Sequence, residues 1–429
     1  MRRLALVLHS HVPYVRRNGV WPAGEDMFHQ VASESYLPLL GVLERLADRG
    51  MHSALTIGIT PVLAHQMQDA HMLRELEAYL ARIELRALRQ VANYRLIHER
   101  EVKDLAAVYA RAGRDAAARL ARCGDGMARA FAAFARDGLI EILGGPATHP
   151  LLPLLSSEIT RRLQMTVGAA EHERVFGGRA SGAWIPECAV APGVETCLAA
   201  ANVAYSVVDP AAAGGAAEPV RAADTEVLLV PRDRVLTDLV WAMDGYPSGE
   251  WYRDFGHHDT VGGFKNWRVT APGATLGDKQ PYEPAAARRA ATEDARHFVA
   301  AVERRFDETG RSDLVVAFDT ELFGHWWFEG PVWLEEVLSA LAVHPSVVPA
   351  TLGEIAASHA GAARAAPAAS SWGAGSDFRN WQSGRTDTLF ERARDAEARA
   401  IPLLGRIGPV RDQMVRELLL LQSSDWPYQ

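Results

Sequence analysis

The stretch that decides the fold is residues 314–327, which read Leu-Val-Val-Ala-Phe-Asp-Thr-Glu-Leu-Phe-Gly-His-Trp-Trp. The first five residues form an apolar run with the length and composition of a buried β-strand. Asp319 and Glu321 follow this run directly, and His325 stands just before two tryptophans. Acids and an imidazole buried among aromatic rings cost free energy unless they are paired, and such costs concentrate at functional sites. Each residue taken singly is more often structural, but together they predict a site at the end of this strand.

A second carboxylate stands in the same kind of setting at Glu187, within residues 182–188, which read Gly-Ala-Trp-Ile-Pro-Glu-Cys. A glycosidic bond breaks through an oxocarbenium-like transition state, which needs one protonated acid at the leaving oxygen and one carboxylate facing the anomeric carbon. The apolar faces of sugar rings lie flat on indole surfaces, a role that suits Trp184, Trp326 and Trp327. Two strand-end carboxylates with neighbouring tryptophans therefore suggest glycoside chemistry.

Short apolar runs recur along the chain, with helical patterns between most of them. This alternation indicates an α/β fold with parallel strands. Polar and aromatic residues gather just past the C-terminal ends of the runs, where barrel sites are built, so we predict an incomplete barrel rather than an open sheet. The predicted strands are residues 4–8, 55–59, 140–143, 204–208, 226–230, 314–318 and 346–348.

The 429 residues exceed one ordinary domain but suit a barrel with additions. Between about residues 65 and 135 the apolar residues follow 3.6-residue spacing, which predicts a helical insertion rather than barrel strands. We therefore assign residues 1–360 to a catalytic barrel that includes this insertion. A connection rich in Ala, Gly and Ser follows at 361–375, and residues 376–429 are predicted to form a C-terminal helical domain.

The composition limits the classes of partner. Apolar residues make up 48% and charged residues 23%, the balance of a soluble globular protein. A net charge of -8 argues against a nucleic-acid partner and favours a neutral ligand. Cys123, Cys188 and Cys197 have no metal-type spacing and cannot all pair, so a reducing compartment is expected. No apolar run is long enough to span a membrane, and His9 cuts short the first one, so we expect a cytoplasmic protein without a membrane partner.

His9 and His11 follow the first predicted strand, where the two-residue period of an extended chain puts both imidazoles on one face. They can therefore meet one ligand, and the structural alternative is a pair satisfied by neighbouring carboxylates. The rival functional hypothesis is a zinc site of His9, His11 and Asp319 that activates water for amide hydrolysis or sugar deacetylation. Against it, no further histidine pair stands beside an acid, and the tryptophans suit a long glycan better. The expectation is therefore a site without metal or cofactor.

Five separated blocks carry a resemblance to a known family. They are residues 9–14 (His-Ser-His-Val-Pro-Tyr), 141–149, 183–187, 319–327, and 371–373 together with Trp381. On these blocks the chain resembles glycoside hydrolase family 57, and within it the 1,4-α-glucan branching enzymes. The resemblance implies an incomplete (β/α)7 barrel and a retaining mechanism. It also implies that Glu187 is the nucleophile and that Asp319 is the general acid/base.

The resemblance also implies roles in substrate binding and transfer, the substrate being a linear α-1,4-glucan. Residues that would hold the sugar at the cleavage point are His9, His11 and His149. Residues that would line the glucan path, together with Trp184 and Trp326, are Trp267, Trp372 and Trp381. In the loop at residues 244–255, glycines permit motion and aromatic rings can cover a sugar. Tyr246 is the first candidate there for assisting transfer, and Tyr252 is the second.

Residues 255–263 look shorter than the matching region of typical branching enzymes, and a smaller lid admits more water. We therefore predict branching accompanied by appreciable hydrolysis. An α-amylase or a 4-α-glucanotransferase would use the same acids, and a non-catalytic glucan-binding protein is a further hypothesis. Members of the family usually continue past this point, so the C-terminal helical domain is expected to be truncated.

Overall fold

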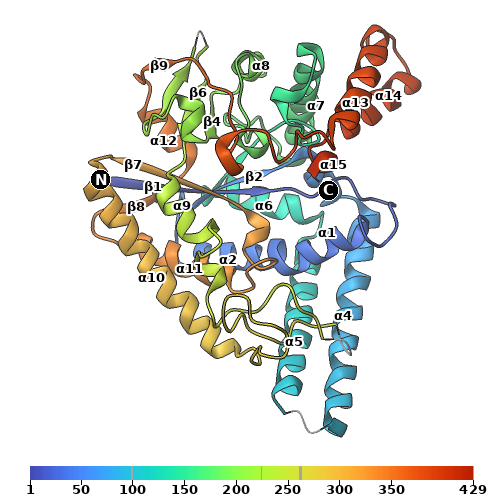
Figure 1. The fold of residues 1–429 in the computed structure, drawn as a ribbon, viewed down its shortest axis with the longest axis vertical. Coiled ribbons are helices and arrows are strands. Elements are labelled where there is room, and N and C mark those ends of the chain that lie inside the picture. The colour runs from blue at the N-terminus through green and yellow to red at the C-terminus, as the bar shows by residue number, and fades with distance from the viewer. Residues whose placement is uncertain (98–99, 224, 260–262, 429) are drawn as a thin grey trace.

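Parallel strands around β1 (Arg2–Ser10) form the centre of the protein (Figure 1). This computed structural model describes residues 1–97, 100–223, 225–259 and 263–428. On one edge β1 pairs with β2 (Leu55–Ile59), and on the other it pairs with β7 (Asp313–Asp319). β3 (Ile140–Leu143) extends the sheet beyond β2. All three pairings are parallel, as the alternation of strands and helices predicts.

The sheet continues through an irregular segment. Single bridges join residues 182–184 to the end of β3 on one side and to β4 (Tyr205–Val208) on the other. β4 pairs in parallel with β6 (Leu228–Pro231), and just past β6 the Asp233 N–H donates to the Val315 carbonyl on β7 at 2.6 Å. The parallel segments thus curl round one interior, which confirms the predicted incomplete (β/α)7 barrel.

Each of the seven predicted strands overlaps an observed one, and one of them lies off the main path of the sheet. The strand predicted at 346–348 is β8 (Val347–Ala350), which pairs in parallel with the first residues of β1. Residues 182–184 occupy a barrel position instead. They make only isolated bridges, and the chain turns soon afterwards at Pro186. The segment is therefore too short to show a strand's periodic signal.

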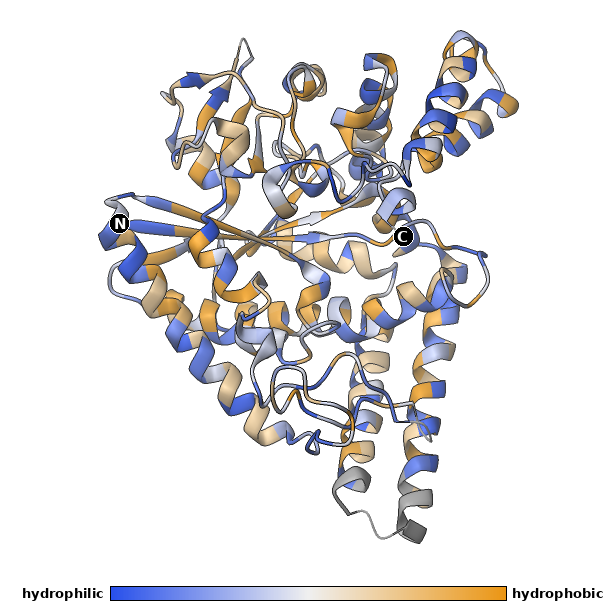
Figure 2. Cartoon of the chain, viewed as in Figure 1, coloured by the Kyte–Doolittle hydropathy of each residue, from blue (hydrophilic) through white to orange (hydrophobic). Residues whose placement is uncertain are grey.

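Side chains alternate between the two faces of β1 and separate two parts of the core. Ala5 and Val7 lie in a buried cluster with residues of β3, β4, β6 and β7, which is the interior of the barrel. Leu4, Leu6 and Leu8 belong to the larger cluster beneath the helices. In Figure 2 the covering helices carry hydrophilic and hydrophobic residues in turn along their length, as expected when only one side is buried.

Helices cover the barrel. After β1, the chain runs without a break through α1 (Glu25–Val31), the π-helical η1 (Ala32–Tyr36) and α2 (Leu37–Asp48). The other covering helices are α7 (Glu158–Phe176), α8 (Val194–Ala200), α9 (Arg234–Trp241), α10 (Pro284–Thr309), α11 (Gly330–Ala342) and α12 (Leu352–Ser358). Two short strands, β5 (Val220–Ala222) and β9 (Arg364–Ala365), extend the β6 edge. They are too short for a periodic pattern, and the sequence did not predict them.

The region predicted as a helical insertion is helical. It contains α3 (Pro61–Gln66), α4 (Ala70–Ile97), α5 (Arg100–Arg122) and α6 (Met127–Arg136), and α4 and α5 form a hairpin that projects from the barrel (Figure 1). The tail is also helical, with α13 (Asp387–Ala400), α14 (Pro409–Leu421) and α15 (Asp425–Tyr428). The predicted connection is held in place, because Ser370 pairs with Val190 through two backbone hydrogen bonds. The division into domains stays a prediction.

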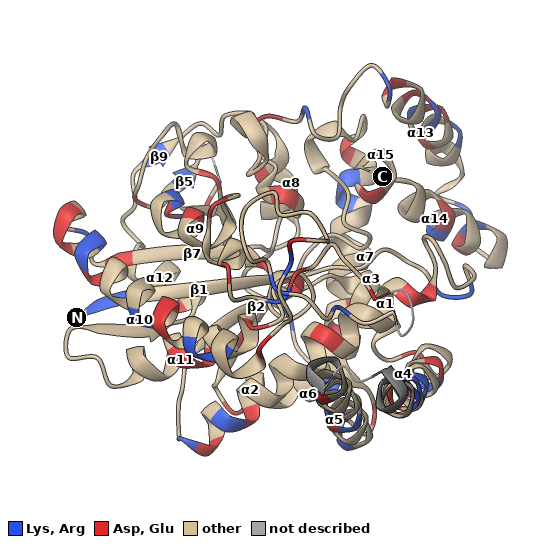
Figure 3. Ribbon diagram, turned by 60° about the horizontal axis from the view of Figure 1, so that its bottom comes forward, with Lys and Arg blue, Asp and Glu red and all other residues tan. Residues whose placement is uncertain are grey.

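Charge is mixed over the surface. In Figure 3 basic and acidic residues alternate along the same helices, so this view shows no face of a single sign. Within the described part of the chain, no helix is both long and apolar enough to cross a membrane.

Gly324, just past β7, lies where the strand-end loop packs closely against η1. Its φ is +110°, and a β-carbon there would stand 1.8 Å from the Glu34 carbonyl oxygen. Gly324→Ala is therefore expected to push the loop away from η1 and to lower the free energy of unfolding by about 2–4 kcal/mol. Chemical denaturation of the variant and the parent measures this loss.

Gly193→Ala is the matched control. Gly193 has a φ of +95°, and among the described residues no atom lies within 4 Å of the position that a β-carbon would take. This variant should lose only the free energy of unfolding that a β-carbon costs at a positive φ, about 1–2 kcal/mol. Equal losses in the two variants would contradict the packing argument at Gly324.

Candidate active site

The pairing of β1 with β7 brings a histidine and an acid together at the end of the barrel. His9 and Asp319 are register partners at the C-terminal ends of these two strands. Side chains at this end of a parallel barrel converge on one region. Glu321, two residues beyond Asp319, accepts hydrogen bonds from the Tyr36 hydroxyl and, at 3.0 Å, from the His11 N–H. Burial raises the pKa of Glu321 to about 7.

Glu187 lies in η3 (Pro186–Cys188), where the chain leaves residues 182–184. Its φ is +59° and that of Cys188 is +49°, both in the left-handed region that residues with a β-carbon seldom adopt. Strain of this kind concentrates at functional sites. The Trp372 indole N–H donates to the Glu187 carboxylate at 2.7 Å, and the Trp372 backbone N–H donates to the Glu187 carbonyl at 2.9 Å. Two contacts from one residue therefore fix the acid.

The two carboxyl groups differ in environment. Burial raises the pKa of Glu187 to about 7, while the Trp372 hydrogen bond and the charge of His11 oppose the rise. Burial also raises the pKa of Asp319 well above its ordinary value, and the charges of Glu321 and Glu187 add to the rise. Among the described residues, none donates a hydrogen bond to the Asp319 carboxylate. Glu187 is therefore the easier of the two to ionise, and Asp319 holds its proton more firmly.

Three stacked imidazoles lie beside these acids. The His9 and His149 Nε2 atoms are 2.9 Å apart, so one ring donates and the other accepts, and the His11 and His149 ring centres are 3.9 Å apart. The Trp184 ring stacks on the His9 ring, with the ring centres 4.5 Å apart. Burial lowers the pKa of both His9 and His149, so both are neutral near pH 7. The prediction that His9 and His11 share a face is confirmed, and His149 joins them.

Residues from the tail complete the cluster, and sequence reasoning missed them. Asp425 lies 2.9 Å from His11 Nε2, and Ser424 Oγ lies 2.8 Å from His149 Nδ1. Burial opposes ionisation of Asp425, but the charge and hydrogen bond of His11 lower its pKa to about 2. His11 and Asp425 are 414 positions apart, and no local pattern links them.

The predicted tryptophans fall into two groups. Trp326 is 38% exposed and lies 6.1 Å from Trp241, which in turn lies 6.4 Å from the half-buried Trp372. Trp241 is 46% exposed and was not predicted, although its position as the last residue of α9, just before a glycine-containing loop, is a usable signal. These three indoles form one aromatic surface, which is joined to Glu187 by the hydrogen bond of Trp372.

Three of the other predicted indoles are buried, and the indole of Trp267 is half-buried. Trp184 and Trp381 are buried, the first behind His9 and the second in a small cluster with Leu151 and Ala189. Trp327 is 1% exposed and packs in the core, so the expectation that it offers a face to sugar is wrong. Its neighbour Trp326, which was also predicted, stays exposed. Trp267 lies in the irregular segment after α9, where its carbonyl accepts from the Asp254 N–H.

The loop tyrosines have partners of their own in this conformation. The Tyr246 hydroxyl lies 2.6 Å from His297 Nδ1, and its ring is near Trp333. The Tyr252 hydroxyl donates to Asp294, and its ring is buried. Neither has a described contact with Glu187 or Asp319. The stretch expected to be short, residues 255–263, lies partly outside the described residues.

The rival zinc arrangement can be compared with this geometry. It requires the ring nitrogens of His9 and His11 to converge with Asp319, whereas His9 Nε2 faces His149 and His11 Nε2 faces Asp425. In the part of the chain that the structure describes, no three His, Cys, Asp or Glu side chains are grouped to hold a metal ion.

Several known proteins are similar to this chain in sequence and in structure. The sequence model of Glycosyl hydrolase family 57 matches residues 5–344. A probable 1,4-alpha-glucan branching enzyme of Mycobacterium tuberculosis is 35% identical over 458 residues, which cover 99% of this chain and 86% of the relative. The crystal structure of a branching enzyme from Thermococcus kodakaraensis superposes with a TM-score of 0.92 at 31% identity, covering 100% of this chain and 85% of that one. An alpha-amylase from Thermotoga maritima superposes with a TM-score of 0.87 at 27% identity, covering 99% and 88%. The chain belongs to glycosyl hydrolase family 57.

Proposed function

We propose that this chain is a 1,4-α-glucan branching enzyme, which cleaves an α-1,4 bond and transfers the freed segment to a 6-hydroxyl to form an α-1,6 branch. The observation that carries the proposal is the pair of unequal carboxyl groups at one end of the barrel, Glu187 and Asp319. The names of the two relatives at 31% and 35% identity support branching in particular. The substrate would be a linear α-1,4-glucan, and the pathway would be glycogen synthesis.

The environments of the acids suggest their roles. Glu187 accepts the Trp372 N–H, which stabilises its anion, so it is the better nucleophile. Asp319 keeps its proton because burial and two neighbouring acids disfavour a second charge, so it is the better general acid. In a retaining cycle Asp319 protonates the glycosidic oxygen while Glu187 attacks the anomeric carbon and forms a glycosyl-enzyme. Asp319 then takes the proton of the incoming hydroxyl.

The stacked histidines would bind the sugar whose bond is cut. Because His9 and His149 are neutral, they can both donate to and accept from sugar hydroxyls. Asp425 holds the His11 ring from the side of the tail. Trp241, Trp326 and Trp372 would support the flat faces of further glucose units.

The choice of acceptor separates branching from its alternatives. An α-amylase passes the glycosyl unit to water, and a 4-α-glucanotransferase passes it to a 4-hydroxyl. The alpha-amylase neighbour keeps hydrolysis as the second candidate. For Tyr246 to assist transfer, its hydroxyl must leave His297, so we propose that loop 244–255 rearranges when an acceptor glucan binds. Appreciable hydrolysis would accompany branching.

We also propose a cytoplasmic location. All three cysteines are free, and Cys188 and Cys197 are buried. Burial raises the pKa of Cys197 to about 11, so its reactive thiolate is scarce. Thiols held in this form suit a reducing compartment.

Incubation with amylose tests the proposed function. The expected product is a glucan with new α-1,6 linkages and some free reducing ends, because both acceptors compete for the glycosyl-enzyme. Proton NMR of the α-1,6 anomeric signal, combined with debranching and chain-length analysis, measures the ratio. Reducing sugar without any α-1,6 linkage would assign the chain to the α-amylases, and lengthened linear chains would assign it to the 4-α-glucanotransferases.

Replacing each acid tests its role. Asp319→Asn is expected to lower turnover on glucan by about 10²–10⁴-fold, because general acid–base catalysis has that size. With a donor carrying a good leaving group, added azide should restore turnover in Asp319→Asn and give a glycosyl azide of retained configuration. Glu187→Ala with azide should give the opposite anomer. The same anomer from both variants would contradict the assigned roles.

The Trp372 hydrogen bond is expected to set the acidic limb of the pH profile. The N–H donated to Glu187 lowers the pKa of that carboxyl, so Trp372→Phe should raise it. A hydrogen bond to a charged group contributes about 1.5 kcal/mol, so the acidic limb of kcat/KM should move up by about one pH unit from near pH 7. Trp241→Phe, which changes an indole without a bond to Glu187, is the control. An unmoved limb in Trp372→Phe would contradict this account.

A further inference from the structure

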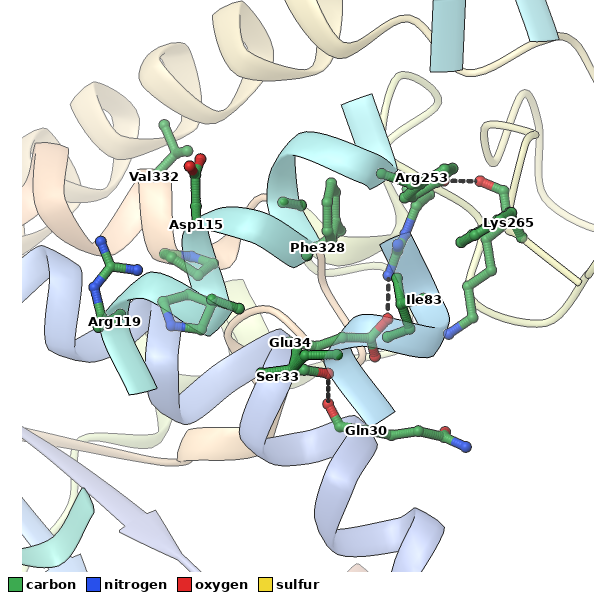
Figure 4. Close-up of a pocket in the computed structure, with 18 of the residues that line it drawn as sticks. Gln30, Ser33, Glu34, Ile83, Asp115, Arg119, Arg253, Lys265, Phe328 and Val332 are labelled. Atoms are coloured by element: carbon green, nitrogen blue, oxygen red, sulfur yellow. Dashed lines mark hydrogen bonds and ion pairs between the residues drawn. The ribbon is translucent and has the colours of Figure 1, made fainter. Parts of the chain in front are cut away.

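A cavity of about 900 Å³ lies away from the catalytic acids, and neither Glu187 nor Asp319 lines it. It lies between the hairpin of α4 and α5, η1, α11 and the irregular segment that follows α9 (Figure 4). Cavities of this size hold small organic ligands. The mechanism proposed above does not use it.

Three cations that line this cavity, the exposed Arg86 and the buried Arg253 and Lys265, are held on aromatic rings. Their distances from the ring centres are 4.5 Å for Arg86 over Phe264, 3.8 Å for Arg253 over Phe328, and 3.9 Å for Lys265 over Phe255. The negative face of an aromatic ring attracts a cation but carries no net charge. The rings therefore fix the positions of these groups and leave their charge uncompensated.

Carboxylates compensate only part of this charge. Glu34 lies 3.4 Å from Arg253 and also 2.6 Å from His325 Nδ1, so it is shared between them. Asp254, which is close enough to affect Lys265, is engaged by Lys279 at 2.9 Å. Among the described residues, neither Arg86 nor Lys265 has a carboxylate within 4.0 Å. An excess of positive charge therefore remains around these three cations.

Among these three cations, Lys265 is the strongest indication of an anion site, because it is 7% exposed and lines the cavity. In Figure 4 its side chain reaches toward Glu34 and Ile83. Burial lowers the pKa of Lys265 to about 8; Glu34 opposes this change and Arg253 adds to it. A buried ammonium without a close anion is costly, and a bound anion would remove that cost.

We propose that this cavity binds a phosphate monoester of a small sugar. The phosphate dianion would lie between Arg86, Arg253 and Lys265, whose donors match its oxygens. The sugar would extend along Gln30, Ser33 and Tyr79, whose polar groups line the neighbouring wall. The carboxylates of Glu335 and Glu336 line the cavity with Arg45 and Arg49 and would disfavour a second phosphate there. The volume exceeds what an inorganic phosphate ion fills.

Titration calorimetry on the full chain tests this proposal with three probes: glucose 6-phosphate, inorganic phosphate and glucose. Glucose 6-phosphate is expected to bind with a Kd below about 1 mM, more tightly than inorganic phosphate, and glucose should bind far more weakly at the cavity. Lys265→Met and Arg86→Met should each weaken glucose 6-phosphate binding by at least about tenfold, since each removes a charge-assisted contact.

Arg114→Met is the matched control. Arg114 is an exposed residue of α5 that pairs with Glu84 at 3.0 Å and does not line the cavity, so its loss should leave the Kd unchanged. Circular dichroism and thermal unfolding check that each variant folds, and removing the unpaired Lys265 charge should not lower stability. If inorganic phosphate binds as tightly as glucose 6-phosphate, the proposal that the ligand carries a sugar is wrong. If glucose binds as tightly as glucose 6-phosphate, the proposal that the cavity selects an anion is wrong. An equal loss in Arg114→Met, or no binding at all, would overturn the site.

Discussion

The structure depends on the parallel register of β1 with β7, which places His9 beside Asp319 at the end of a closed apolar interior. Inside the barrel, small and branched side chains exclude water, so every polar group at its rim must find a partner or change its protonation state. Both outcomes occur at the rim. Histidines pair with one another and stay neutral, and carboxyl groups either gain donors, as Glu187 and Glu321 do, or hold their proton, as Asp319 does.

These arrangements set stability against activity. The folded-state pKa of Glu187 is raised, so its contribution to stability is fully present below its unfolded pKa and is lost as the pH rises through about 7. Asp425 has the opposite sign, because its folded-state pKa is lowered to about 2 and its contribution is lost only in strong acid. The site is therefore held together at neutral pH by the tail acid, while the barrel acids are kept in a costly state that favours proton transfer.

The sequence predicted the fold well because barrel strands carry a local signal. Each of the seven apolar runs predicted as strands overlaps a strand, and the residues just past 8, 143, 186 and 318 became the rim. Local pattern could not show which side chains meet across the fold. Asp425 reaches His11 through the tail, Trp241 meets Trp326 across the rim, and Trp327 turns into the core although its neighbour stays exposed. Adjacent aromatic residues after a strand cannot be told apart until the turn at Gly324 is known, and that turn depends on η1.

The contact between His11 and Asp425 also bears on how the molecule matures. Its two partners lie 414 positions apart, so the residues of the barrel rim are synthesised before the residue that holds His11. The cluster of His9, His11 and His149 lacks the contacts of Ser424 and Asp425 until α14 and α15 dock. Completion of the His11 contact thus depends on docking of the tail against the barrel.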